Sequence, residues 1–507
     1  MYRKNLFIIL IIFIIFTVKF SGAEPAAFII EENEKNIAKI NFDTWIRDTL
    51  AISPDLKRVA CAVKDLEKKY VVVDGKKGKK YDEILPGTPI FSKDSKHVAY
   101  AAKDGTQWVV VVDGKEGKKY SSIRKKGLTF SPDSKKLAYA AGDGDKWFLV
   151  LDDKEGKKYD SVGNILFSPD SRRIAYSAKS EGKFFVVLDG KEWAKYEGVR
   201  IDDNFFSSDG KRTAYSAKVG DKFFVVIDGK EGNKYDAIMP GFPLFSPDGK
   251  RVIFGAQVEG KRFIVVDGKE MKKYDDIATD SLKFSPDGKR VGYAAQLDKK
   301  RLIVVDGKEG KSWENIMGDS PRFSPDSKHV VYGAIQDGKW RIIVDGKASD
   351  EYKGVMKGTP IFNKDGKMVY AAKAEKHQFV VIDGKIPKKY KTVIPGTVKF
   401  SKDGKRLAYG AGNGKNCFAV IDGKEKKKHL GIEQGSFFFS PDSKKLAYVA
   451  LVGADMCVAI DGVEGGKYVA VVLINGAKII FDSPNKFHYL GLKKDGMYLV
   501  EATIKQR

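Results

Sequence analysis

Few side chains in this sequence have the type and spacing that catalysis or metal binding requires. The 507 residues include only 5 histidines and 3 cysteines, and no two histidines are spaced to share a metal ion. The GxSxG, HExxH and GxxxxGK[ST] patterns are absent, so the common signatures of serine hydrolases, zinc peptidases and P-loop nucleotidases are missing. The sequence therefore predicts no catalytic residue, no metal site and no cofactor.

Aspartate is abundant, but its positions favour a structural role. Asp133 and Asp248 stand at the same place in two copies of one phrase, Ser-Pro-Asp followed by Ser or Gly. Proline presets the turn, and the aspartate caps it with its own carboxylate. The clearest carboxylates outside this pattern are Asp202-Asp203 and Glu351, and neither has an obvious partner in the sequence.

These turns belong to a repeat that extends over nearly the whole chain. The phrase FSPDSKKLAYAA at Phe130–Ala141 recurs at intervals of 37 to 39 residues, and a second phrase, VVVDGKKGKKYD at Val71–Asp82, recurs in phase with it. A degenerate last copy begins at Phe481. Such a period is typical of solenoids and propellers. The leading residues of the full copies are Ile52, Phe91, Phe130, Phe167, Phe206, Phe245, Phe284, Phe323, Phe362, Phe400 and Phe439.

Each unit reads as four short strands, a to d. Strand a ends in Phe-Ser, and strand b is a run such as Val98–Ala102. Strand c is a continuous apolar run such as Phe223–Ile227, which predicts burial on both faces. An Asp-Gly hairpin signal then leads into strand d. Four antiparallel strands in about 40 residues predict a propeller blade.

The phrase Ser-Pro-Asp-Gly-Lys-Arg-Val, at Ser246–Val252 and Ser285–Val291, resembles the TolB-type, WD-like β-propeller repeat of bacterial envelope proteins. The resemblance covers about residues 50–500 and implies an all-β propeller. Two departures limit it: the 24–49 segment is too short for the α/β domain of TolB, and TolB has about half as many blades. The resemblance therefore implies the repeat and not the role in envelope maintenance.

The number of units predicts about twelve four-stranded blades of about 39 residues. We expect two six-bladed rings, at 24–262 and 263–507, although no linker is visible between them; one large ring or unequal rings are the alternatives. The C-terminal piece 478–504 resembles strands a, b and c. The segment 38–44 is then expected to supply the missing strand d and close the ring.

The first 23 residues have the layout of a secretory signal peptide. Arg3 and Lys4 precede an apolar run from Leu6 to Val18, and small residues precede a cleavage site between Ala23 and Glu24. The run is shorter than the roughly 20 residues that span a bilayer. The sequence therefore predicts an exported protein, periplasmic or secreted; an uncleaved N-terminal tether is the alternative.

The formal charge of +24 is concentrated in two sets of turns. In an up-and-down blade, the a–b and c–d turns lie on one face, and both are rich in lysine and arginine, as at Lys250-Arg251 and Lys115. This face could attract an anionic polymer or a membrane surface. The alternative is that the repeated lysines keep the protein soluble and protect strand edges. Nucleic acid is not expected as a partner of an exported protein.

The b–c and d–a loops are irregular and make the opposite face a candidate for binding a protein or a glycan. The entry to strand c carries aromatic residues in some units and arginine in others; packing between blades is the alternative reading. The leading function is thus a non-catalytic binding scaffold. A propeller-type polysaccharide lyase or hydrolase is the alternative and would need polar side chains to converge on a central channel. The binding candidates are Trp108, Trp147, Arg262, Arg301, Trp340 and His377.

Overall fold

The computed structural model describes residues 28–39, 44–241, 243–473 and 478–507. The predicted signal peptide and its cleavage site at Ala23 and Glu24 lie outside these residues. The helical segments of the described part are two 3₁₀ turns, η1 (Arg47–Thr49) and η2 (Thr279–Ser281). No helix in these ranges is long and apolar enough to cross a membrane.

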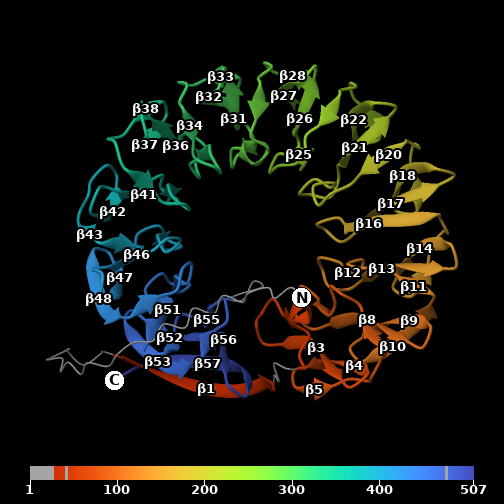
Figure 1. Ribbon diagram of the computed structural model, residues 1–507, viewed down its shortest axis with the longest axis horizontal. Helices are drawn as coiled ribbons and strands as arrows, with labels where there is room; N and C mark the ends of the chain where they lie inside the picture. The colour runs from red at the N-terminus through yellow and green to blue at the C-terminus, as the bar shows by residue number, and fades with distance from the viewer. Residues whose placement is uncertain (1–27, 40–43, 242, 474–477) are drawn as a thin grey trace, which may run out of the picture.

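The described strands form twelve antiparallel sheets that follow one another around a ring (Figure 1). We number them blades 1 to 12 in chain order, from β2–β5 to β54–β57. Each blade has four strand positions, from strand a at the centre of the ring to strand d at its rim, as in the blade 6 order β24-β26-β27-β28. The expected all-β propeller with about twelve four-stranded blades is confirmed.

Strand a consists of two short segments in most blades, and both pair with strand b. Blade 4 instead has one strand, β16 (Ser161–Phe167). The first segments are β6 (Glu83–Ile84), β11 (Ser122–Ile123), β20 (Gly198–Arg200), β24 (Ala237–Ile238), β29 (Asp276–Ile277), β34 (Asn315–Ile316), β39 (Gly354–Val355), β44 (Thr392–Val393), β49 (Gly431–Ile432) and β54 (Ala470–Val471). The second segments are β2 (Ala51–Ile52), β7 (Ile90–Phe91), β12 (Thr129–Phe130), β25 (Leu244–Phe245), β30 (Lys283–Phe284), β35 (Arg322–Phe323), β40 (Ile361–Phe362), β45 (Lys399–Phe400), β50 (Phe438–Phe439) and β55 (Ile480–Ser483).

Strands b and c form the long central hairpin of every blade. The b strands are β3 (Val59–Asp65), β8 (Val98–Asp104), β13 (Leu137–Asp143), β17 (Ile174–Ser180), β21 (Ala214–Val219), β26 (Val252–Val258), β31 (Val291–Leu297), β36 (Val330–Gln336), β41 (Met368–Lys373), β46 (Leu407–Gly412), β51 (Leu446–Val452) and β56 (Lys486–Lys493). The c strands are β4 (Lys68–Val73), β9 (Gln107–Val112), β14 (Lys146–Leu151), β18 (Lys183–Leu188), β22 (Lys222–Ile227), β27 (Lys261–Val266), β32 (Lys300–Val305), β37 (Lys339–Val344), β42 (Gln378–Ile382), β47 (Cys417–Ile421), β52 (Asp455–Ile460) and β57 (Gly496–Gln506).

Strand d follows the Asp-Gly turn. At Asp267 and Gly268 both φ angles are positive, 51° and 83°, the backbone that a tight two-residue hairpin requires. The d strands are β5 (Lys76–Lys77), β10 (Lys115–Tyr120), β15 (Lys154–Glu155), β19 (Lys191–Glu192), β23 (Lys230–Glu231), β28 (Lys269–Glu270), β33 (Lys308–Glu309), β38 (Lys347–Ala348), β43 (Lys389–Tyr390), β48 (Lys424–His429), β53 (Val463–Tyr468) and, in blade 12, β1 (Phe28–Ala38).

The irregular segments expected between strands d and a lie elsewhere. The true d–a connection is very short, since β10 ends at Tyr120 and β11 begins at Ser122. The irregular segment 86–89 (Pro-Gly-Thr-Pro) instead interrupts strand a of blade 2. It lies between β6 and β7, which both pair with β8. These interruptions lie along the central opening of the ring (Figure 1). The irregular segments therefore line the channel.

Apolar cores between neighbouring blades hold the ring together. Phe263, Ile264 and Val265 in β27 are fully buried, as the continuous apolar run predicts. The ring of Phe263 meets that of Tyr235, from the preceding blade, edge to face at 5.6 Å. Burying one such side chain contributes about 1.5–3 kcal/mol, and the same contact type recurs at successive seams.

The cores close into one ring, so the predicted division into 24–262 and 263–507 is wrong. Its boundary falls inside β27, and one core joins blades 5, 6 and 7. The core between blades 12 and 1 contains Leu490 and Leu499 with Leu56 and Val59. The structure thus has the alternative, one large ring (Figure 1). The interface between blades at the expected ring boundary has the same kind of apolar core as the other interfaces, so the series of packed blades continues through it.

The ring is closed by strands from both parts of the chain. β1 pairs with β57 from Phe28↔Gln506 to Ala38↔Met497. The prediction that the N-terminal part supplies strand d of the last blade is confirmed, but the strand is 28–38 and not 38–44. The glutamate Glu32 joins this strand to blades 11 and 12, because it accepts hydrogen bonds from Gly466 N (2.9 Å) and the hydroxyls of Tyr468 (3.2 Å) and Tyr489 (2.9 Å).

A buried histidine completes the contact between blades 12 and 1. His488 stands in β56 where most other blades have a small or β-branched residue. Its Nδ1 lies 2.7 Å from Asp482 Oδ2, and its Nε2 donates to the carbonyl of Asp55, in blade 1, at 2.7 Å. The shortened turn of blade 12 lacks the Ser-Pro-Asp phrase of other blades, and His488 makes the contact to the next turn.

We predict that Glu32→Ala weakens ring closure by about 2 kcal/mol, because the buried Tyr489 hydroxyl and Gly466 N lose their charged acceptor, whereas the Tyr468 hydroxyl keeps Glu34 at 2.7 Å. The measurement is hydrogen–deuterium exchange of the β1 amides, which should become faster while blades 5–7 keep their protection. Glu31→Ala is the matched control, since Glu31 forms only an exposed ion pair with Lys505 of the neighbouring strand β57. Equal exchange in both variants would contradict the closing role of Glu32.

Candidate binding face

The a–b and c–d turns lie together on one face, which we call the lysine face. Arg58 follows the a–b turn of blade 1, and its Nε donates to Asp74 in the c–d turn at 2.8 Å. On the other face, Gly105 N in a b–c hairpin donates to Asp82, just before strand a, at 2.8 Å. We call this second face the hairpin face.

The predicted tryptophan candidates of the hairpin face are half-buried in seams between blades. Trp108 packs with the core that joins blades 2 and 3, Trp147 with that of blades 3 and 4, and Trp340 with that of blades 8 and 9. Arg262 fills the same position in blade 6 and pairs with Asp276 of blade 7. These side chains contribute to the seams, as the packing alternative suggested.

The remaining two candidates are exposed but lie apart. Arg301 begins strand c of blade 7, and His377 lies in the b–c loop of blade 9. The structure thus distributes the six predicted residues over six blades and brings none of them into one site. Whether they bind a ligand stays a prediction.

The carboxylates that break the repeat do not converge either. Asp202, at the channel in blade 5, accepts from Arg200 Nε at 2.8 Å. Glu351, at the rim of blade 8, pairs with Lys339 at 2.7 Å and with Arg341. Across the described ranges, no three His, Cys, Asp or Glu side chains are grouped to hold a metal ion.

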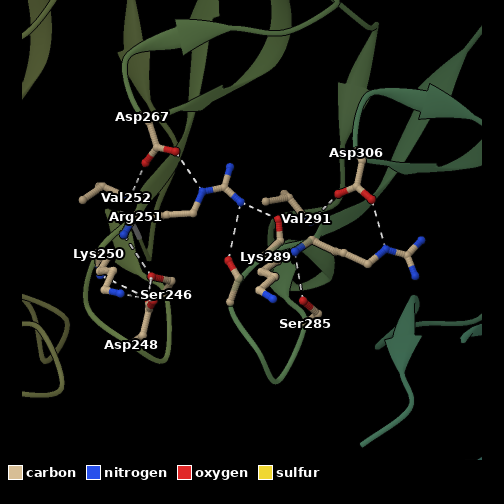
Figure 2. A network of polar contacts seen from close by, with 12 residues as sticks. Ser246, Asp248, Lys250, Arg251, Val252, Asp267, Ser285, Lys289, Val291 and Asp306 are labelled. Atoms are coloured by element: carbon tan, nitrogen blue, oxygen red, sulfur yellow. Dashed lines mark hydrogen bonds and ion pairs between the residues drawn. The ribbon is translucent and has the colours of Figure 1, made fainter. Parts of the chain in front are cut away.

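On the lysine face, each a–b turn is organised by its aspartate. In blade 6, Asp248 Oδ1 accepts from the Ser246 hydroxyl at 2.6 Å and from Lys250 N at 3.1 Å (Figure 2). Ser246 Oγ in turn accepts from Arg251 N at 2.9 Å. These bonds favour the ionised carboxylate, so the pKa of Asp248 is lowered from 3.8, mainly by the serine hydroxyl. These hydrogen bonds confirm the prediction that the aspartates cap the turns.

The arginine after the turn joins one blade to the next. Arg251 Nε donates to Asp267 Oδ2 at 2.9 Å, and its Nη1 donates to the carbonyl of Lys289, in blade 7, at 2.6 Å (Figure 2). The guanidinium also lies 5.7 Å from the ring centre of Phe284. We call this arrangement the arginine clamp. It recurs, with a carboxylate in the same blade and contacts to the next, at Arg58, Arg173, Arg212, Arg290 and Arg406.

Part of the lysine content is also bound between blades. In the c–d turn region of blade 1, Lys79 Nζ pairs with Glu116 of blade 2 at 2.8 Å, and Glu116 accepts from the Tyr81 hydroxyl at 2.7 Å. The same contact joins the Tyr196 hydroxyl to Glu231 at 2.9 Å. Burial, with this bond, raises the pKa of Tyr196 to about 12, so it stays a neutral donor.

One lysine in each of ten successive c–d turns is left exposed. It follows the Asp-Gly or Asp-Asp of the turn, and it forms no ion pair with another residue of the described ranges. These lysines lie on the same face as the arginine clamps, which are neutralised by their aspartates. We call them the turn lysines: Lys76, Lys115, Lys154, Lys191, Lys230, Lys269, Lys308, Lys347, Lys385 and Lys424.

Four turn lysines, Lys76, Lys154, Lys230 and Lys308, line grooves of about 380 to 410 Å³. Each groove lies at a seam, between strand c and the c–d turn of one blade and strand b of the next. The groove of Lys308 is also lined by Gly310, directly after β33, where a side chain has little room because a Cβ would lie 3.1 Å from the carbonyl oxygen of Ile303. The grooves were not expected from the sequence, although the recurring Gly-Lys after the Asp-Gly turn is a signal for them.

The comparisons with known proteins concern the fold. No protein-family model and no curated protein matches the sequence. Among solved structures, TolB from Acinetobacter baumannii is 17% identical over 50% of this chain and 78% of its own, with a TM-score of 0.22. The propeller of the Trilobed protease from Pyrococcus furiosus is 16% identical over 53% and 97%, with a TM-score of 0.26. At these scores neither carries an argument about what this chain binds.

We predict that the turn aspartates make the fold sensitive to acid. The pKa values of Asp94, Asp133, Asp248 and Asp287 are lowered in the folded state from 3.8. Their stabilisation is therefore fully present above about pH 3.8 and is lost as the pH falls through the lower folded pKa values. The midpoint of thermal unfolding should be nearly constant from pH 7 to 5 and should fall steeply below pH 4.

High salt provides the control for this measurement. Repulsion among the excess positive charges would be screened at about 0.5 M salt, whereas the loss of serine–aspartate bonds would remain. A midpoint that stays flat to pH 3, or a loss that salt abolishes, would contradict the role of the turn aspartates.

Proposed function

We propose that this chain is a non-catalytic ring scaffold that binds an anionic polysaccharide through its lysine face. The proposal rests on the turn lysines, which present one unneutralised positive charge per blade over ten successive blades. Single exposed ion pairs contribute at most about 1 kcal/mol, so no one lysine would capture a ligand. Ten on one rigid frame engage a repeating polymer together, and each further contact benefits from a high effective concentration.

The grooves favour a chain molecule over a flat surface. A bilayer would meet the outermost atoms of the turns, whereas four turn lysines line concave seams beside apolar strand residues and at least two carboxylates, such as Glu155 and Asp189 in the seam of Lys154. A polysaccharide can enter such seams and place a carboxylate or sulfate beside each of these four lysines. Export, which the first 23 residues predict, would bring the protein to acidic glycans outside the cytoplasm.

The experiment measures binding to immobilised polygalacturonate. Replacing Lys76, Lys154, Lys230 and Lys308 by Gln should weaken binding about tenfold or more at low ionic strength, because four contacts of a multivalent set are lost. Binding of the unaltered protein should weaken steadily as salt is raised.

The matched control removes the same charge from the hairpin face. Lys68, Lys146, Lys222 and Lys261 are exposed and each pairs with a half-buried aspartate there, and their replacement by Gln should change binding less than about twofold. Equal weakening by both variants would mean that net charge alone attracts the polymer. Binding to phosphatidylglycerol vesicles but not to polygalacturonate would favour a membrane surface and contradict the proposal.

A further inference from the structure

A groove on the channel side of blades 10 to 12 differs from the seam grooves. It has a volume of about 470 Å³ and is formed by the second segments of strand a and the beginnings of the a–b turns. Its lining includes three lysines and no acidic residue. We call it the inner groove, and the residues that carry the argument are Lys399, Phe400, Lys402, Phe438, Lys478 and Phe481.

The position before the last phenylalanine of strand a varies between blades. It is apolar at Ile90 and Leu244, and phenylalanine occupies it in blade 5, as the buried Phe205, and in blade 11, as the partly buried Phe438. In blade 10 it holds Lys399. The inner groove is therefore built at a variable position of the channel wall, where a lysine and a partly exposed aromatic ring come from neighbouring blades.

Lys399 has no ion-pair partner among the described residues, in contrast to the cations that occupy the equivalent position of strand a in blades 7 and 8. Lys283 and Arg322, the equivalents in blades 7 and 8, are both neutralised by Asp319, with an Arg322–Asp319 distance of 2.7 Å. Lys399, Lys402 and Lys478 are exposed, and none forms an ion pair with any residue that the structure describes. Their positive charges thus remain uncompensated beside an aromatic surface.

Lys402 is a further substitution, of a kind that blades 2 and 9 also carry, at Lys93 and Lys364. It occupies the proline position of the Ser-Pro-Asp turn, which Pro247 and Pro286 hold in blades 6 and 7. Proline makes no charged contact, so this substitution adds a cation at the rim of the inner groove without altering the turn: Ser401 still donates to Asp403, at 2.5 Å.

We infer that the inner groove binds a carboxylated sugar residue, such as a uronate. The ring of Phe438 is partly buried against the core of blades 11 and 12. Its exposed part offers an apolar face for the C–H side of a sugar ring, and Lys399 and Lys402 offer charged donors for the sugar carboxylate. A volume of about 470 Å³ is in the range of small-ligand sites. The inference deepens the proposed function, because this groove would select the sugar while the turn lysines hold the polymer.

The test uses trigalacturonate, which is too short to span several blades, and calorimetric titration at about 0.15 M salt. The unaltered protein should bind it, and Lys399→Ile and Phe438→Leu should each lower the affinity about tenfold, by loss of a charged contact or of the stacking surface. Both new residues occur at this position in other blades, as Ile90 and Leu244, so the variants should retain the fold, which their thermal unfolding curves verify.

A pair of proline variants supplies the control. Lys402→Pro should weaken binding, whereas Lys93→Pro, the same change in blade 2 and far from the groove, should leave it unchanged. Absence of binding, or unchanged affinity in the blade 10 and 11 variants, would overturn the inference. So would equal affinity for the fully methyl-esterified trimer, which lacks the charge, or for benzoate, which lacks the sugar. Polygalacturonate binding by the turn lysines is measured separately and would survive each of these results.

Discussion

The whole structure depends on the burial of two apolar faces on every blade. A sheet whose strand c is buried on both sides cannot exist alone in water, so each blade needs a neighbour on either side. Phe263, in the middle of the chain, and Leu499, near its end, meet this need in different seams of the same ring. Only closure leaves no blade with an exposed face. The strand pair β1–β57 and the buried Glu32 and His488 contacts provide that closure.

The polar residues of the repeat follow from the same constraint. Arg251 reaches from its own blade to the carbonyls of the next turn, and Glu116 receives both Lys79 and Tyr81 from the blade before it. These contacts orient neighbouring blades, whereas the apolar cores supply most of the stabilisation. Among the lysines that these contacts leave without an ion pair in the described ranges are the turn lysines and the lysines of the inner groove. The binding proposals rest on this remainder.

Much of the fold could be predicted from the sequence because the period, the Asp-Gly hairpins and the apolar strand c are local signals. The number of rings could not be predicted, because the interface between blades 6 and 7 has the same residue types as the other interfaces. In addition, Glu32 and Tyr489, which help to close the ring, are far apart in the chain. The site was harder still. Trp108 and Trp147, predicted as binding candidates, lie partly buried against seam cores. The position of Lys399 and Phe438 at the channel could not be predicted, because the interruption of strand a leaves no clear local signal in the sequence.

The central claim, one closed ring with all turn lysines on one face, is tested most directly by electron cryo-microscopy of the full-length protein. We predict axial views that show a single ring of twelve blades, with density for β1 joined to β57. Two six-bladed rings, or an open arc with a gap between the first and last blades, would contradict it.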